Sequence, residues 1–213
     1  MEMIGVSHLY VNVYISIKIL YYIIILVLKY ILYNYIFMNS LTNLYNRFGE
    51  NGTTIISLLS IYLLREKSCA LFYYIVGLLI DIILNLVLKG IIQQPRPCFN
   101  SKEVDLAIKN NKRLVYKDGI PYDLFGMPSG HSEWCLYSTS YVYLVLRKTN
   151  WLYVYLFLSF ITMSQRVAFN HHTISQVIVG ASVGTLLGYI MYKTTTNVNK
   201  GKLTEKPDDN API

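Results

Sequence analysis

The residues best suited to chemistry lie in the turn Gly126–His131, which leads into an apolar stretch. Pro128 has a fixed φ and no backbone N–H, so it suits the first turn of a helix. Gly130 has no Cβ and lets a ligand approach the backbone closely. The N–H groups of Ser129, Gly130 and His131 would then face an anion, which the helix dipole favours there. The Ser129 hydroxyl adds a donor, and His131 can give a proton to a leaving oxygen.

Taken alone, this turn is better explained as a proline–glycine helix cap in which His131 is merely polar. Two cationic stretches elsewhere favour a binding role. In the first, Asp81, Asn85 and Lys89 recur every four residues of an apolar segment and so share one helix face. Charged groups inside a bilayer usually mark function, although a polar seam between helices with a snorkelling lysine explains the same pattern. Arg96 follows between two prolines, where its planar fork matches phosphate oxygens.

The second cationic stretch begins at Arg166, beside another apolar segment. Further on, His172 and Gln176 are four residues apart on a predicted helix that runs to Met191. A side-chain carbonyl one turn away can accept from one ring nitrogen and leave the other nitrogen free to attack. For the histidines alone, capping or interface polarity is the simpler interpretation.

The bulk composition indicates a membrane protein. Hydrophobic residues make up 54% of the 213-residue chain, and the mean hydropathy is +0.37. Long apolar runs explain both values. The net charge of +7 comes mostly from loops and the tail, so it favours anionic lipids or phosphorylated substrates over nucleic acid. The three cysteines form no CxxC pair and no metal spacing, which favours free thiols.

We therefore predict an all-α, polytopic membrane protein with about six transmembrane helices. The segment Thr53–Leu64 is short for a span. A polar loop over residues 98–125 separates the third span from the fourth. The expected organisation is an N-terminal membrane segment and connector (1–52), a core (53–192) and a disordered polar tail (193–213). The six segments are Tyr10–Phe37, Thr53–Leu64, Cys69–Ile92, Ser132–Leu146, Asn150–Ser164 and the helix ending at Met191.

The three stretches together resemble the signatures of the type 2 phosphatidic acid phosphatase superfamily in order and spacing. They read Lys89-x6-Arg96-Pro97, then Pro128-Ser129-Gly130-His131, then Arg166-x5-His172. The resemblance covers about Thr53 to Met191 and implies a helical membrane phosphatase. By position it implies that His172 is the nucleophile, which becomes phosphorylated, and that His131 is the general acid. The phosphate-binding residues that it implies are Lys89, Arg96, Ser129, Gly130 and Arg166.

Two positions depart from the superfamily's usual pattern. Gln165 stands where a serine usually precedes the third-motif arginine, and Gln176 stands where an aspartate usually follows the nucleophile. A glutamine can orient an imidazole but cannot stabilise an imidazolium by charge. The dolichyldiphosphatase branch, however, has glutamine at that place, and the chain resembles it over three stretches. These are Ile92–Cys98, Phe125–Ser132 and His172–Val177, and Asn85 also fits.

The resemblance implies hydrolysis of a polyprenyl diphosphate, such as dolichyl diphosphate, to the monophosphate and inorganic phosphate. No metal or cofactor is implied, because three cations supply the charge that a metal would otherwise supply. The partners expected are the lipid substrate and the bilayer. Three alternatives stay open: a phosphatase for phosphatidate or another lipid phosphate, a non-catalytic lipid-phosphate binder, and a purely structural membrane protein.

The distribution of cations suggests an orientation in the membrane. With six spans, one side carries most of the basic residues outside the motifs, and the positive-inside tendency makes that side cytoplasmic. The motifs then face the lumen or the exterior, and resemblance to dolichyldiphosphatases implies the lumen of the endoplasmic reticulum. The basic loop from Lys102 to Lys117 favours the opposite orientation. The cytoplasmic set is Arg65, Lys67, Arg147, Lys148, Lys193, Lys200, Lys202 and Lys206.

Overall fold

A computed structural model describes residues 29, 38–110, 112–117 and 120–202. The first predicted span, Tyr10–Phe37, therefore lies outside the described residues except for Lys29. The chain divides into two compact units, Met1–Tyr45 and Asn46–Ile213. In the first unit, residues 38–45 are helical, and the Thr42 hydroxyl donates to the Met38 carbonyl at 2.8 Å.

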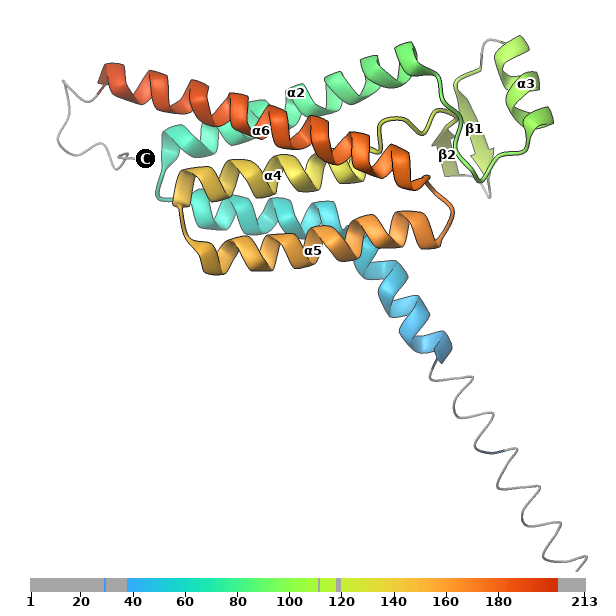
Figure 1. Ribbon diagram of the computed structural model, residues 1–213, viewed down its shortest axis with the longest axis horizontal. Coiled ribbons are helices and arrows are strands. Elements are labelled where there is room, and N and C mark those ends of the chain that lie inside the picture. The colour runs from blue at the N-terminus through green and yellow to red at the C-terminus, as the bar shows by residue number, and fades with distance from the viewer. Residues whose placement is uncertain (1–28, 30–37, 111, 118–119, 203–213) are drawn as a thin grey trace, which may run out of the picture. The chain divides into compact units, whose positions relative to one another are not determined.

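The second unit is a bundle of helices with a small cap at one end (Figure 1). Long apolar stretches between polar breaks form the bundle, so the predicted helical fold is confirmed. Its members are the helical residues 46–64, α2 (Ser68–Ile92), α4 (Gly130–Leu146), α5 (Thr149–Ala168) and α6 (Ile174–Lys202). The cap consists of α3 (Ser101–Lys109), β1 (Leu114–Lys117) and β2 (Ile120–Asp123).

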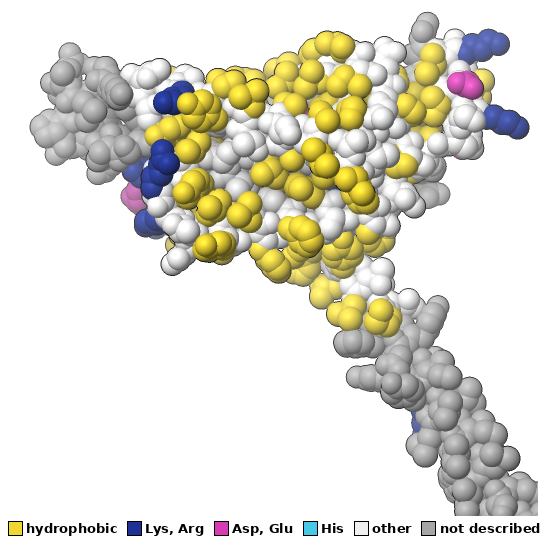
Figure 2. Space-filling view, viewed as in Figure 1, with side chains coloured by type: hydrophobic (Ala, Val, Ile, Leu, Met, Phe, Trp, Pro, Cys, Tyr) yellow, Lys and Arg dark blue, Asp and Glu magenta, His cyan; other side chains and the backbone are white. Residues whose placement is uncertain are grey.

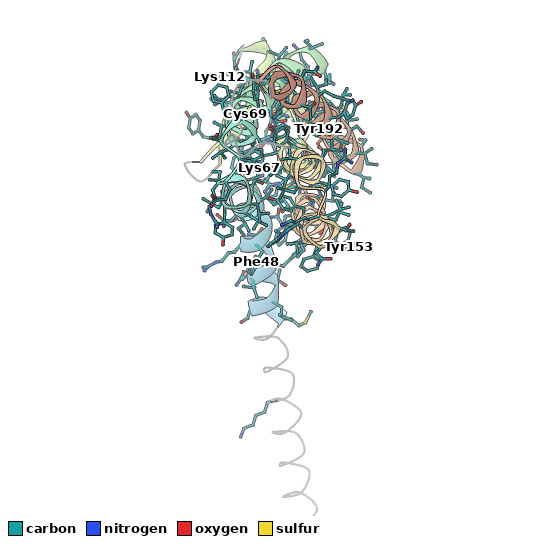
Figure 3. All side chains as sticks on the ribbon, turned by 90° about the vertical axis from the view of Figure 1, so that its left-hand side faces the viewer. Phe48, Lys67, Cys69, Lys112, Tyr153 and Tyr192 are labelled. Carbon is teal, nitrogen blue, oxygen red and sulfur yellow. The ribbon has the colours of Figure 1, made fainter. Side chains whose placement is uncertain are left out.

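The outer surface of the bundle is largely apolar. Figure 2 shows hydrophobic side chains spread over the long helices, with Lys and Arg gathered toward the two ends of this face. In Figure 3, which looks along the bundle, Tyr153 of α5 points away from its neighbours, and its exposed fraction is 67%. Among the described residues, two stretches are long and apolar enough to cross a membrane: Ser68–Ile92 and Ile174–Val198.

Helices α4 and α6 make the closest packing in the bundle, because α6 places three glycines along one face. A Cβ on Gly180 would collide with the Ser129 carbonyl oxygen. One on Gly184 would collide with the Glu133 carbonyl, and one on Gly188 with the Ser140 hydroxyl. This approach fixes the start of α4, and with it the Ser129–His131 motif, against the first turns of α6.

The cap was predicted only as a polar loop, and its secondary structure is a finding. Asn100 and Glu103 form a capping box that starts α3. In the antiparallel hairpin, Val115 pairs with Tyr122. Short elements with mixed polar composition give weak periodicity, so they are difficult to predict from the sequence. Their buried apolar side chains are Phe99, Val104, Ala107, Leu124 and Phe125.

Two segments are more helical than predicted. Residues 39–52, expected as a polar connector, are helical, and the Asn46 amide donates to the Glu50 carboxylate one turn later at 3.1 Å. Helix α6 continues through residues 193–202, where a disordered tail was expected. There the Thr195 hydroxyl is buried and meets the Tyr141 hydroxyl at 2.9 Å. In the first of these elements polar side chains bond along the helix, and in the second they bond between helices.

Candidate active site

His172 lies in the loop just before α6, and its hydrogen bonds define its tautomer. Its Nδ1 lies 2.9 Å from the Gly126 carbonyl oxygen and 3.2 Å from the Gln176 Oε1. Both oxygens only accept, so Nδ1 carries the proton. Nε2 lies 2.9 Å from the Arg96 Nη1, which can only donate. The lone pair of Nε2 is therefore directed toward a cation, where an anionic ligand would also bind.

The Gln176 amide is oriented from both sides. Its Nε2 donates to the Pro95 carbonyl at 2.9 Å and to the Gln94 Oε1 at 3.2 Å. Its Oε1 accepts from the Thr173 backbone N–H at 3.2 Å. The oxygen is therefore fixed toward His172. Glycine is required at position 126, since a Cβ there would lie 2.5 Å from the same oxygen.

The imidazole of His172 is neutral at physiological pH. Burial, followed by the charges of Arg96, Lys89 and Arg166, lowers the pKa of His172 from 6.5 to about 2. A neutral ring with a free Nε2 lone pair can act as a nucleophile. Burial also lowers the pKa of the neighbouring His171, and the nearby Arg166 adds to the effect.

Arg96 is anchored to the cap. Its Nε donates to the Asp123 carbonyl at 2.8 Å, and its backbone N–H donates to the Leu124 carbonyl at 3.1 Å. The same Nη1 that faces His172 also donates to the His171 carbonyl at 3.3 Å. The second strand of the hairpin thus holds the guanidinium beside His172.

Two functional candidates on the cap were missed by the sequence analysis, Asp123 and Arg113. The Asp123 carboxylate lies 3.9 Å from the Lys89 Nζ and accepts from both Nε and Nη2 of Arg113, the latter at 2.9 Å. Lys89 is buried at 6% exposure, so this carboxylate partly balances its charge. Both residues stand among other loop charges in the sequence, and only the hairpin's register distinguishes them.

Arg166 enters the site from the end of α5. It is 7% exposed, and its Nη1 donates to the Gln165 Oε1 at 3.3 Å. Gln165 is itself buried, and its amide contacts the Asn46 side chain. Within the described part of the chain, the Arg166 Nε has no hydrogen-bond partner. A buried guanidinium with a free donor is suited to an anion.

The Ser129–His131 motif begins α4, with one change from expectation. Ser129 is the N-cap, so Pro128 lies before the helix and not in its first turn. The Ser129 backbone N–H donates to the Gln176 carbonyl at 3.0 Å, so the prediction that it faces an anion is wrong. The N–H groups of Gly130 and His131 open the helix and have no partner within it. The Ser129 hydroxyl accepts from the Ser132 hydroxyl at 3.1 Å, which leaves its own proton to donate.

The predicted residues gather at one end of the bundle. Lys89 and Arg96 act electrostatically on each other and on His172. The His131 ring forms a hydrogen bond with the Glu50 backbone and is acted on electrostatically by Arg166 and Arg96. Three cations, two histidines, a hydroxyl and a helix N-terminus around one point can bind a phosphoryl group, attack it and protonate a leaving group. Among the described residues, no group of three or more His, Cys, Asp or Glu could hold a metal ion.

Comparison with known proteins agrees with this arrangement. The chain is 32% identical over 127 residues to a dolichyldiphosphatase of Saccharomyces cerevisiae, covering 54% of this chain and 48% of that one. It is 28% identical over 138 residues to dolichyldiphosphatase 1 of Rhinolophus ferrumequinum, covering 57% and 51%. The chain thus spans about half the length of the curated relatives it matches.

A solved structure and a family profile also match this chain. The crystal structure of Aquifex aeolicus LpxE resembles this structure with a TM-score of 0.55 at 20% identity, over 72% of this chain and 86% of that one. That likeness concerns the fold. The sequence profile of the PAP2 superfamily matches residues 70–200, which include all three motifs. The chain therefore belongs to the PAP2 superfamily of phosphatases.

Proposed function

We propose that this chain is an integral membrane phosphatase that hydrolyses a polyprenyl diphosphate, such as dolichyl diphosphate, to the monophosphate and phosphate. The observation that carries the proposal is His172. Its Nδ1–H is held by Gly126 and Gln176, and its Nε2 lone pair faces Arg96. The names of the two curated relatives support the diphosphate as substrate, and the apolar outer faces of the helices support a membrane setting.

In the first half-reaction, Arg96 turns from the ring nitrogen to a phosphate oxygen, which leaves the His172 Nε2 free to attack phosphorus in line. Arg166 and Lys89 bind the remaining oxygens. As the bridging P–O bond breaks, His131 gives a proton to the leaving lipid phosphate. A phosphohistidine remains on His172.

In the second half-reaction, water attacks the phosphohistidine from the side that the lipid phosphate has left. His131, now neutral, takes the proton of that water, and the P–N bond to His172 breaks. Inorganic phosphate forms, and both histidines return to their starting states. The charge in this scheme is supplied by Lys89, Arg96 and Arg166 throughout.

We further propose that the enzyme resides in the endoplasmic reticulum membrane with its site facing the lumen. Resemblance to the dolichyldiphosphatase branch implies a role in N-glycosylation at that membrane, so the location depends on the proposed substrate. The basic side chains Arg65, Lys67 and Arg147 stand at helix ends remote from the motifs, which favours a cytoplasmic side there.

Phosphate release in detergent tests the proposal. Purified protein is given dolichyl diphosphate, dolichyl monophosphate or phosphatidate, each with excess EDTA and each with vanadate. We expect release mainly from the diphosphate, unaffected by EDTA and blocked by vanadate. Preference for phosphatidate would replace the proposed substrate, and loss of activity on chelation that magnesium restores would reject the mechanism. No release from any substrate, with lipid phosphate still bound, would instead indicate a binder.

A further inference from the structure

Two carboxyl groups that the proposed mechanism leaves without a role lie inside the bundle beside the site. Asp81 of α2 is 2% exposed and Glu133 of α4 is 0% exposed. The two side chains lie within hydrogen-bonding reach of each other. Burying two adjacent negative charges costs more free energy than burying one, so the pair holds at least one proton. Ionisable groups inside membrane bundles commonly serve as proton relays.

Each of these carboxyl groups has one oxygen without a hydrogen-bond partner among the described residues. Asn85 donates to the Glu133 Oε2 at 2.6 Å and to the Pro128 carbonyl at 3.3 Å, which holds Glu133 against the start of the second motif. The Asp81 Oδ1 and the Glu133 Oε1 have no hydrogen-bond partner in the described part of the chain. Buried polar atoms need a partner, and water is the usual one when protein offers none.

A cavity of about 250 Å³ is lined by both Asp81, one member of this pair, and His131. Its wall contains polar groups from three helical segments. They are Asp81 and Asn85 of α2, Thr53 of the helical residues 46–64, and His131 of α4. One water occupies roughly 30 Å³ of liquid, so the cavity has room for several. Its polar groups are numerous enough to bind them. Asp81 and His131 thus share one hydratable space.

His131 needs such a proton source. As the general acid it must be protonated, yet it sits near the guanidinium groups of Arg166 and Arg96. A third positive charge there is unfavourable until the negative substrate binds. His131 therefore has to receive its proton when the substrate binds, inside a buried site.

On the basis of the function proposed above, we propose that Asp81 and Glu133 form a proton store. When substrate binds, this store protonates His131 through the cavity. In the proton-loaded state of this proposal both carboxyl groups are protonated, and the pair gives up one of its two protons. The Asp81 O–H bond breaks, water in the cavity passes the proton on, and an N–H bond forms on His131. Glu133 is still protonated and within reach, so it can donate a hydrogen bond that stabilises the carboxylate left on Asp81.

The proton returns within the same cycle. His131 gives it to the bridging oxygen as the P–O bond breaks, then takes one from the attacking water. When phosphate leaves, His131 passes that proton back to Asp81, so no outside donor is consumed. The titratable groups that face the pair come from α2 and α4, and Gly184 of α6 lies against the Glu133 backbone. They are Lys89, His131, Cys135 and Tyr137.

The pH profile of turnover tests the relay, with Asp81→Asn as the variant. Without this proton store, His131 can take its proton only from solution. We expect turnover of the lipid diphosphate to fall about tenfold or more at pH 8 and to recover toward the wild-type value near pH 5.5. The alkaline limb of the profile then lies at lower pH than in the wild type. Glu133→Gln on the neighbouring helix is expected to behave alike and serves if Asp81→Asn does not fold.

Thr139→Val is the matched control, because Thr139 is also buried on α4 but does not line the cavity, and its hydroxyl contacts the Cys135 carbonyl and the Ser159 hydroxyl. Its profile should keep the wild-type shape. A uniform loss at every pH in Asp81→Asn, or no loss at all, would overturn the relay. Failure of the wild-type protein to release phosphate would instead reject the proposed function. If it prefers phosphatidate, the same shift is expected with that substrate.

Discussion

Gln176 holds the His172 ring in place of the aspartate that the superfamily usually has there. Its amide is fixed by Gln94, Pro95 and Thr173, so it can orient the ring without a charge of its own. We expect Gln176→Ala to lower turnover on the order of ten- to a hundredfold, because a loosened nucleophile misses its attack geometry. Steady-state kinetics measure this loss. Ser175→Ala, an exposed neighbour, should keep wild-type turnover, and an equally active Gln176→Ala would remove the positioning role.

The pKa of His172 gives a second residue-scale prediction. Because its folded pKa is lowered from 6.5 to about 2, the folded protein does not bind this proton between those values, whereas the unfolded chain does. The free energy of unfolding should therefore fall as the pH drops below about 6.5. In the free protein, the His172 carbon signals, assigned by their loss in His172→Ala, should not titrate between pH 5 and 8. A midpoint near 6.5 would contradict the neutral, buried ring.

The sequence predicted the long helices because apolar stretches between polar breaks are a strong signal. It also proposed the site residues, which the fold places at one end of the bundle. It could not show that the Ser129 N–H is already bonded to the Gln176 carbonyl, because that contact joins residues far apart in the chain. Asp123 and Arg113 were hidden for the same reason, since only the hairpin pairs them.

At the scale of the elements, packing of the bundle depends on how closely α6 approaches α4. Gly184 lies against the Glu133 backbone, with no space for a side chain. We expect Gly184→Ala to lower the melting temperature in detergent by several degrees, because the backbones must separate. Gly90→Ala on α2 is the control, since the nearest atom to its Cβ would be 3.8 Å away. Equal melting temperatures for both variants would show that this contact does not limit the packing.

At the scale of the whole second unit, the structure separates two ends. The motifs and the cap lie at one end, while the start of α2 and the end of α6 lie at the other (Figure 1). An orientation across a membrane therefore predicts opposite accessibility for Ser101 and Asn197, both exposed. In a background without the three native cysteines, Ser101→Cys and Asn197→Cys are treated with an impermeant maleimide in sealed vesicles. One should be labelled and the other protected, and equal labelling of both would contradict the spanning arrangement.

The central claim is that His172 becomes phosphorylated, and it is tested most directly by trapping the intermediate. His171 lies next to it in sequence, but only His172 has its Nδ1 held by Gly126 and Gln176. Acid-labile phosphate on the protein is measured by mass spectrometry after a brief reaction with lipid diphosphate. We expect the label on His172, its complete loss in His172→Ala, and turnover reduced about 10⁴-fold or more in that variant. His171→Ala should keep both label and most activity. A label on His171, or full activity in His172→Ala, would contradict the account.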